Sequence, residues 1–376
     1  MKAVALLGKT LLVLVALLIL AAAAGYAWLQ FGDWQARTVR DLEFVHATIL
    51  EHHPGPVDPE NPGFVTLMDE AYARALPLAE TARTASDHRA ALDAYMDTFN
   101  DGHLTVATIM DGFDALSSRA ENTTRMAATS GVGIADNEAW ITITSFNERN
   151  APIASLTQEI EAQASELRSL DRVVFDLRGN GGGDSSFGTR IVRALWSEEV
   201  YRDWIPVSAG AVDWRATADN AAHVHAIAQR HSDNGRPENA RYWSDLADRI
   251  DSAVRAGDNY VRQNFRTREV TRTVESPVTA DVIVITDGAC ASSCLNFMDE
   301  LLALPGVRHV GEETSSDTQY IDVRWVDLPS GIGRLWVPLK VYRDRLRPSG
   351  GTYVPQISVD AATLDPANLD VLLEAE

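Results

Sequence analysis

The stretch RVVFDLRGNGGG, residues 172–183, joins a short run of apolar residues to a glycine-rich turn. Its first half predicts a strand that is buried on both faces, because strands of parallel sheets read as continuous apolar runs. A helical pattern follows at 187–196, and the same order of strand, turn and helix returns at 282–286 and 292–304. Two such units predict an α/β fold in which helices pack on a parallel or mixed sheet.

The rest of the chain is predicted to divide around this α/β core. Residues 35–125 carry apolar side chains at helical spacing and predict an N-terminal helical unit. Residues 130–360 hold the strand and helix units and predict the α/β domain, and residues 361–376 form a C-terminal tail. A polar segment at 205–275, with helical spacing over 212–264, predicts a helical insertion that acts as a lid.

Residues 1–30 predict an export signal. Lys2 and Lys9 precede an apolar run at 11–29, and this order is typical of a secretory signal peptide. The run is also nearly long enough to cross a bilayer as a helix. A cleaved signal and an uncleaved membrane anchor therefore both remain open. Either one places the body of the chain outside the cytoplasm, in the periplasm or another extracytoplasmic compartment.

The charge of the chain excludes one class of partner. Asp and Glu number 53 against 33 Lys and Arg, so the formal net charge is −20. Such a surface repels nucleic acid and anionic lipid, which leaves residues 11–29 as the predicted membrane contact. Lysine occurs only at Lys2, Lys9 and Lys340, so the basic groups of the body are almost all arginines.

The glycine-rich turn, residues 178–183, offers backbone N–H groups for chemistry. Its spacing differs from G-x-G-x-x-G and no lysine follows it, so the pattern does not favour nucleotide phosphate. Backbone N–H groups that no side chain screens can face a developing negative charge. A tight turn by itself needs one or two glycines, so the repeated glycines favour a functional turn.

A second candidate is the run CASSC, Cys290 to Cys294, at the start of the helix after the second buried strand. Ser292 or Ser293 there could be a nucleophile at the positive end of the helix dipole, with the next N–H as one half of an oxyanion hole. Either serine could instead be a simple N-cap. The two cysteines could form a disulfide or be two small buried apolar residues.

A third candidate is Asp101-Gly102-His103, a turn that ends the N-terminal helical unit. His103 could act as a general base that the neighbouring Asp101 carboxylate orients. Taken alone, the motif equally describes a histidine in a surface loop.

Together, DGHL, FDLRGNGGG, the serine-bearing helix start and HVGEET, in this order, resemble the tail-specific or C-terminal-processing serine peptidases. The resemblance implies a crotonase- or ClpP-like superhelix of mixed sheet and helices, a peptide or protein substrate, and no cofactor. When Gly311-Glu312 is aligned with the glycine and glutamate of the family's matching stretch, the resemblance implies that Ser292 is the nucleophile. The oxyanion donors would be the N–H of Ser293 and that of Gly181 or Gly182.

The resemblance also bears on the general base. One branch of the family uses a lysine whose register falls on Asp317 here, and residues 10–339 contain no lysine. The tricorn-protease-like branch uses a histidine from a DGH-like motif, which His103 matches. That branch has a late glutamate that helps orient the site, and the matching stretch 347–355 has no acid. Asp101 and Glu312 are therefore the candidate orienting acids.

Two further expectations complete the interpretation. Too few residues separate His103 from Asp176 for a PDZ domain, which many relatives insert there. The sequence thus predicts an exported serine peptidase that cleaves peptides or unfolded proteins through an acyl-enzyme, with no metal and no cofactor implied. The alternatives are a catalytically silent binding protein on the same fold and an esterase or amidase. The sequence does not specify an oligomeric state.

Overall fold

The computed structural model describes residues 32–108 and 130–374, so the predicted export segment, residues 1–30, lies outside the described residues. None of the helices described is long and apolar enough to cross a membrane. The chain divides into two compact units. Of the described residues, unit 1 comprises residues 32–108, Arg215–Asn259 and Asp322–Leu339, and unit 2 comprises residues 130–214, Tyr260–Ile321 and residues 340–374.

A six-stranded sheet forms the centre of unit 2, in the order β11-β8-β7-β4-β3-β2. Its strands are β2 (Gly131–Ala135), β3 (Glu138–Thr142), β4 (Arg172–Asp176), β7 (Asp281–Thr286), β8 (Val307–Gly311) and β11 (Ile357–Ser358). All neighbours pair parallel except β2 and β3, which pair antiparallel. The α/β fold with a mixed sheet that the sequence predicted is confirmed.

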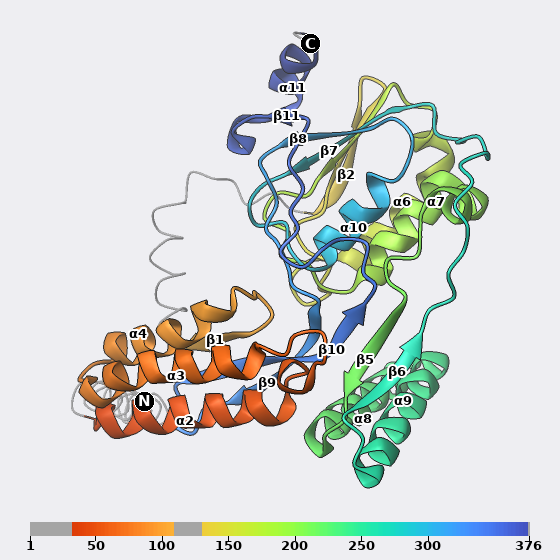
Figure 1. The fold of residues 1–376 in the computed structure, drawn as a ribbon. Helices are drawn as coiled ribbons and strands as arrows, with labels where there is room; N and C mark the ends of the chain where they lie inside the picture. Colours follow the sequence, from red (N-terminus) through yellow and green to blue (C-terminus); the bar gives the residue numbers. More distant parts are fainter. Residues whose placement is uncertain (1–31, 109–129, 375–376) are drawn as a thin grey trace, which may run out of the picture. The chain divides into compact units, whose positions relative to one another are not determined.

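The two faces of this sheet bury alternate residues of the same strands. Phe175 and Val284 pack on one face, in one apolar cluster with residues of three helices. These are α6 (Ile153–Leu167), α7 (Ser185–Trp204) and α10 (Ser293–Leu301), which lie on the same side of the sheet (Figure 1). Val174 and Ile283 point to the other face, where residues of the C-terminal segment cover them. That segment contains β11, the 3-10 helix η3 (Ala361–Thr363) and α11 (Pro366–Glu374). Burial on both faces explains why these strands are continuously apolar.

The predicted helical insertion is present, but its two ends are strands. It contains α8 (Ala218–Asp233) and α9 (Pro237–Ala256), flanked by β5 (Ala211–Arg215) and β6 (Tyr260–Asn264). The expectation that 212–264 is helical throughout is therefore wrong at both ends. β5 forms because it pairs antiparallel with β10 (Gly333–Arg343), where Trp214 lies opposite Lys340. The role of the insertion as a lid stays a prediction.

Over the described part of the predicted N-terminal unit, residues 35–108, the chain forms three helices in unit 1, and residues 109–125 of that prediction lie outside the described residues. Helices α2 (Trp34–His52), α3 (Phe64–Thr81) and α4 (Ala85–Met96) lie side by side, and the strand β1 (Thr105–Thr108) follows them. A buried pair between the His88 imidazole and the Asp41 carboxylate, 2.9 Å apart, joins α4 to α2. Asp41 also accepts a hydrogen bond from the backbone of Ser330, in the turn between β9 (Tyr320–Asp327) and β10.

Candidate active site

The glycine-rich turn leaves the carboxyl end of β4 and enters α7. Gly179, Gly182 and Gly183 have φ values of 75°, 98° and 141°, which favour glycine over every other residue. A Cβ atom added to Gly182 would lie 2.8 Å from the Cβ of Ser292 and 2.9 Å from the backbone nitrogen of Ser293. The glycines therefore let this turn approach the start of α10 at backbone distance.

Two polar side chains hold the turn in this conformation. The buried Asn180 amide donates to the Ile143 carbonyl (2.9 Å), and its oxygen accepts from the Gly182 N–H (2.9 Å). The Asp287 carboxylate, just after β7, accepts from the Gly179 N–H (3.0 Å). The turns after the adjacent parallel strands β4 and β7 are thereby tied together. Carboxyl ends of parallel strands are where α/β folds place ligands.

Ser292 lies at the N-cap position of α10, in the loop that follows β7. Its φ of 56° and ψ of −117° lie outside the regions that non-glycine residues ordinarily occupy, at a cost of roughly 1–3 kcal/mol. Its side chain makes no capping hydrogen bond to the helix. Ser292 is therefore not a simple N-cap, and a strained turn from strand to helix is typical of a nucleophilic serine.

Ser293, by contrast, anchors the glycine turn. Its hydroxyl donates to the Gly183 carbonyl (2.6 Å) and accepts from the Ser185 hydroxyl (2.9 Å), and the side chain is buried. Within the described residues, no acceptor is hydrogen-bonded to the backbone N–H of Ser293 or of Gly181. The Gly182 N–H is occupied by Asn180. The N–H groups of Ser293 and Gly181 could therefore donate hydrogen bonds to a ligand.

The two central glycines provide a matched pair of substitutions. Gly182→Ala is expected to lower the unfolding free energy by about 2 kcal/mol or more, because the new Cβ meets backbone atoms and the φ is positive. Gly181→Ala is expected to be tolerated, because nothing lies within 4 Å of its added Cβ. Thermal melts and peptide hydrolysis of both variants test this. Equal melting temperatures would show that the close approach at Gly182 is not required.

Cys290 and Cys294 form a disulfide that brackets Ser292. Both cysteines are fully buried, in the same apolar cluster as Phe297. The bridge ties the loop before Ser292 to the first turn of α10. It therefore constrains the backbone on both sides of the strained serine.

Removing the disulfide is expected to destabilise this loop. In the loop-closure account, a bridge over so short a segment contributes about 2 kcal/mol. We expect the Cys290→Ala, Cys294→Ala double variant to melt at a lower temperature and to lose part of its activity. Melting curves of the variant and of the reduced wild-type chain give the measurement. An unchanged melting temperature and unchanged activity would show that the bridge is not needed to hold Ser292.

The Asp101-Gly102-His103 motif forms a tight turn in unit 1. Asp101 accepts a hydrogen bond from the His103 backbone N–H (2.8 Å), and its carboxylate oxygen lies 3.6 Å from the His103 Nδ1. The Asp101 side chain is 3% exposed and that of His103 is 13% exposed. Burial lowers the pKa of the nearby His53 to about 3, against the opposing effect of the Asp101 charge. Asp101 thus lies beside a partly exposed imidazole that it can orient.

Glu312 has a different environment, in unit 2. Its carboxylate accepts a hydrogen bond from the Ala361 N–H (3.0 Å), at the start of η3. Its own N–H donates to the Thr286 carbonyl (3.0 Å). Through these contacts Glu312 anchors the C-terminal segment. Asp101 is therefore the stronger of the two candidate orienting acids.

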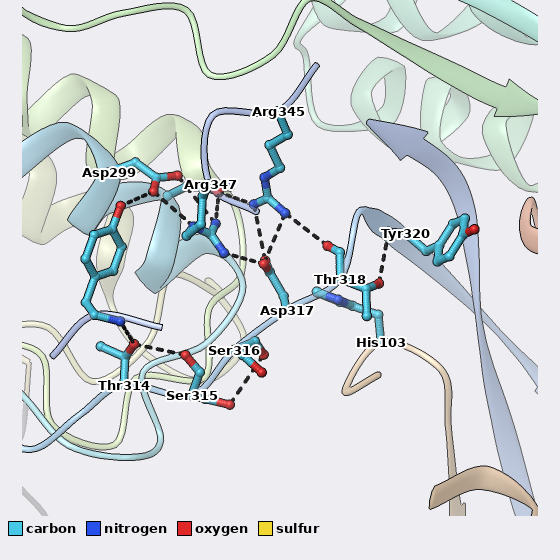
Figure 2. Close-up of polar contacts among 12 residues, drawn as sticks. His103, Asp299, Thr314, Ser315, Ser316, Asp317, Thr318, Tyr320, Arg345 and Arg347 are labelled. Carbon is cyan, nitrogen blue, oxygen red and sulfur yellow. Dashed lines mark hydrogen bonds and ion pairs between the residues drawn. The ribbon is translucent and has the colours of Figure 1, made fainter. Parts of the chain in front are cut away.

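Asp317 is the centre of a buried ionic cluster that sequence reasoning did not foresee. It accepts hydrogen bonds from the guanidinium groups of Arg345 (3.0 Å) and Arg347, and Arg347 also bonds to Asp299 (3.0 Å) (Figure 2). Asp317 is 4% exposed and Arg347 is 6% exposed. In the register of the lysine-using branch, the position of the base is therefore occupied by a carboxylate that is bound to two guanidinium groups.

The only lysine among the described residues has a packing role. The Lys340 ammonium lies 4.7 Å from the centre of the Trp214 ring and 5.4 Å from that of Tyr342. Such contacts stabilise a cation against aromatic faces. The geometry therefore provides a structural reason for this lysine.

Several functional contacts of the site were not predicted. Asn180, Ser185 and Asp287 hold the glycine turn and the start of α10 in place. Asn180 could have been noticed in the sequence, since it is the one residue other than glycine between Gly179 and Gly183. Ser185 and Asp287 could not, because each acts through a partner far away in the sequence.

The sequence of the chain matches the model of one protein family. The model of peptidase family S41 matches residues 137–332, more than half of the chain. This range contains the glycine turn, the disulfide and Ser292, and ends before Lys340. A sequence search of curated proteins finds no match.

Several solved structures resemble this chain over most of its length. The chain resembles mature CPAF at 10% identity and a TM-score of 0.55, over 87% of this chain and 93% of that one. It resembles mature CPAF complexed with lactacystin at 11% identity and a TM-score of 0.55, over 91% and 97%. A lipoprotein from Streptococcus agalactiae matches at 11% identity and a TM-score of 0.44, over 90% and 96%. At these identities the two CPAF structures establish a shared fold.

Proposed function

The chain belongs to peptidase family S41 and is a serine-type peptidase, and from this premise we propose that Ser292 is its nucleophile and His103 its general base. The observation that carries the proposal is the environment of Ser292. It occupies a strained turn at the start of α10, does not cap the helix, and is followed by Ser293, whose N–H has no acceptor among the described residues. The family favours a peptidase over a silent binding protein or an esterase.

The proposed reaction is an acyl transfer through a covalent intermediate. His103 takes the proton of the Ser292 hydroxyl as the oxygen attacks the carbonyl carbon of the scissile peptide bond. The oxyanion of the tetrahedral intermediate accepts hydrogen bonds from the N–H groups of Ser293 and Gly181. His103 then gives the proton to the leaving amine. Water attacks the acyl-enzyme by the same route and releases the second product.

We also propose that Asp101 orients His103. Its carboxylate is almost fully buried and is fixed by the backbone of the same turn, so it can hold the imidazole without moving. A carboxylate beside the Nδ1 favours the tautomer whose other nitrogen accepts the serine proton.

The proposed compartment is outside the cytoplasm. The apolar run at 11–29 supports export. The Cys290–Cys294 disulfide agrees with it, because disulfides persist mainly in oxidising compartments. Fractionation of cells that produce the full chain, with and without residues 1–30, tests the proposal. Recovery of the full chain in the cytoplasm would contradict it.

A fluorophosphonate probe tests the proposed nucleophile directly. The wild-type chain is expected to be labelled stoichiometrically, with the adduct on Ser292 by mass spectrometry of the digested protein. A panel of peptides and small esters is expected to show turnover of peptides. Labelling far below one probe per chain would instead favour a silent binding protein, and turnover of esters alone would favour an esterase.

A further inference from the structure

A cavity of about 590 Å³ lies within unit 2. Ser185 and Asn296 line one part of it, and these two residues connect it to the proposed active site. The Asn296 amide donates to the Ser185 hydroxyl (2.9 Å), which in turn donates to the hydroxyl of Ser293, the neighbour of Ser292. The cavity therefore begins one helical turn from the proposed nucleophile.

The cavity extends from there along one face of α10. Asn296 and Glu300 both line it and stand four residues apart, which places them on the same side of the helix. From Ser293 to Glu300 the helix rises about 10 Å. Ile205, Val207 and Leu346 contribute aliphatic surface to the same cavity. A long side chain with an apolar stem matches this length and lining.

Glu300 is the acidic group of the cavity whose hydrogen bonds are incomplete. Its Oε1 accepts from the Thr189 hydroxyl (2.7 Å) and the Tyr201 hydroxyl (3.2 Å), and both donors also line the cavity. Its Oε2 has no hydrogen-bond partner within the described residues. Burial raises the pKa of this carboxyl to about 7. An unpaired carboxyl oxygen at this depth favours a ligand that donates to it.

The other charged groups around the cavity have partners. Arg347 is bonded to Asp299 and Asp317. The Nη2 of Arg268 donates to the backbone carbonyls of Tyr201 and Ile205, and its guanidinium lies over the Tyr201 ring, while its Nε has no hydrogen-bond partner within the described residues. The charge of Arg193, on α7, lowers the pKa of the Glu300 carboxyl, and the charge of Asp299, its neighbour on α10, raises it.

We propose that this cavity is a subsite for a substrate side chain, and that Glu300 makes it selective for a lysine or arginine next to the scissile bond. The aliphatic wall takes the methylene stem, and the ammonium or guanidinium group supplies the donor that Oε2 lacks. Opposite charge adds to the hydrogen bond, so a cation is favoured over a neutral group of the same length. This inference rests on the proposed role of Ser292.

A matched series of peptides tests the subsite. The peptides differ only in the residue before the scissile bond, which is arginine, lysine, norleucine, glutamine or glutamate. We expect kcat/KM for arginine and lysine to exceed that for norleucine on the order of tenfold. The preference should grow from pH 6 to pH 8, as the Glu300 carboxyl ionises. Equal values for lysine and norleucine would overturn the inference, and a preference for glutamate would assign recognition to Arg268 instead.

Glu300→Gln is the decisive variant. Glutamine keeps an acceptor for Thr189 and Tyr201 and stays neutral, so the variant is expected to melt at or above the wild-type temperature at pH 8. It should lose the preference for cationic side chains and its growth with pH, so that kcat/KM for arginine and lysine peptides falls to that for norleucine peptides. Glu161→Gln, which removes a surface carboxylate paired with Arg190, is the charge control and should keep the preference. Retention of the preference in Glu300→Gln would overturn the inference.

A binding measurement separates this inference from the proposed function. In Ser292→Ala, calorimetry with N-acetyl-arginine amide should detect binding that Glu300→Gln in the same background weakens on the order of tenfold. Binding of this kind would support the subsite even if Ser292 were not the nucleophile. If the wild-type chain cleaves peptides but no binding is detected in Ser292→Ala, the subsite is wrong and the proposed function stands.

Discussion

Replacing Ser292 with alanine is expected to reduce kcat for peptide hydrolysis on the order of 10⁴-fold or more, because the acyl-enzyme cannot form without the hydroxyl. The fold should be retained, since the Ser292 side chain does not cap α10. Alanine adopts a positive φ no more readily than serine does, so the strain of the turn stays the same. Steady-state hydrolysis of a fluorogenic peptide and a thermal melt of the same sample give the two measurements.

Ser293→Ala is the matched control for this experiment. It removes the hydrogen bonds to Gly183 and from Ser185, so we expect a loss of about 1–3 kcal/mol in unfolding free energy. The backbone N–H that we assign to the oxyanion stays in place, so kcat should fall far less than in Ser292→Ala. Equal losses of activity in the two variants, or a loss only in Ser293→Ala, would contradict the assignment of the nucleophile.

The sequence predicted the central sheet because its signals are local. The apolar run at 172–177 predicted β4, and the run at 282–286 predicted β7. Both strands are buried on two faces, which is why their sequences are continuously apolar. The helix start at Ser292 could be placed because a buried strand and a short polar turn precede it. The positions of the glycine turn and of the CASSC run thus follow from composition over a few residues.

The supports of the site could not be predicted, because they depend on partners far away in the chain. β5 is short and exists by pairing with β10, so Trp214 meets Lys340 only in the folded chain. Asp317 is stabilised by arginines 28 and 30 residues later, and no local pattern joins them. Asn180 bonds to the Ile143 carbonyl, 37 residues earlier. Long-range polar contacts of this kind fix the geometry of a site whose residues are visible in the sequence.

The choice between a histidine and a lysine base depends on where the one lysine of the described residues stands. Lys340 packs over the rings of Trp214 and Tyr342 in the middle of β10. An ammonium that contributes to aromatic packing is stabilised in its charged form, whereas a lysine base must be neutral to accept a proton. In the register of a lysine base the chain instead has Asp317, which is bound by two arginines.

Lys340→Ala is therefore expected to lower the unfolding free energy by about 0.5–1 kcal/mol and to lose little activity.

His103→Ala is expected to lower kcat/KM by ~10²-fold or more, the usual contribution of a general base. Asp101→Asn should have a smaller effect, because the imidazole would remain and lose only its orienting charge. Imidazole added to the buffer should restore part of the activity of His103→Ala and none of that of Ser292→Ala, since it can replace a missing base but not a missing nucleophile. Burst kinetics with an activated ester would show that acylation is the step that recovers. The opposite pattern, an inactive Lys340→Ala and an active His103→Ala, would exclude the histidine and make a Ser–Lys dyad the remaining account of catalysis.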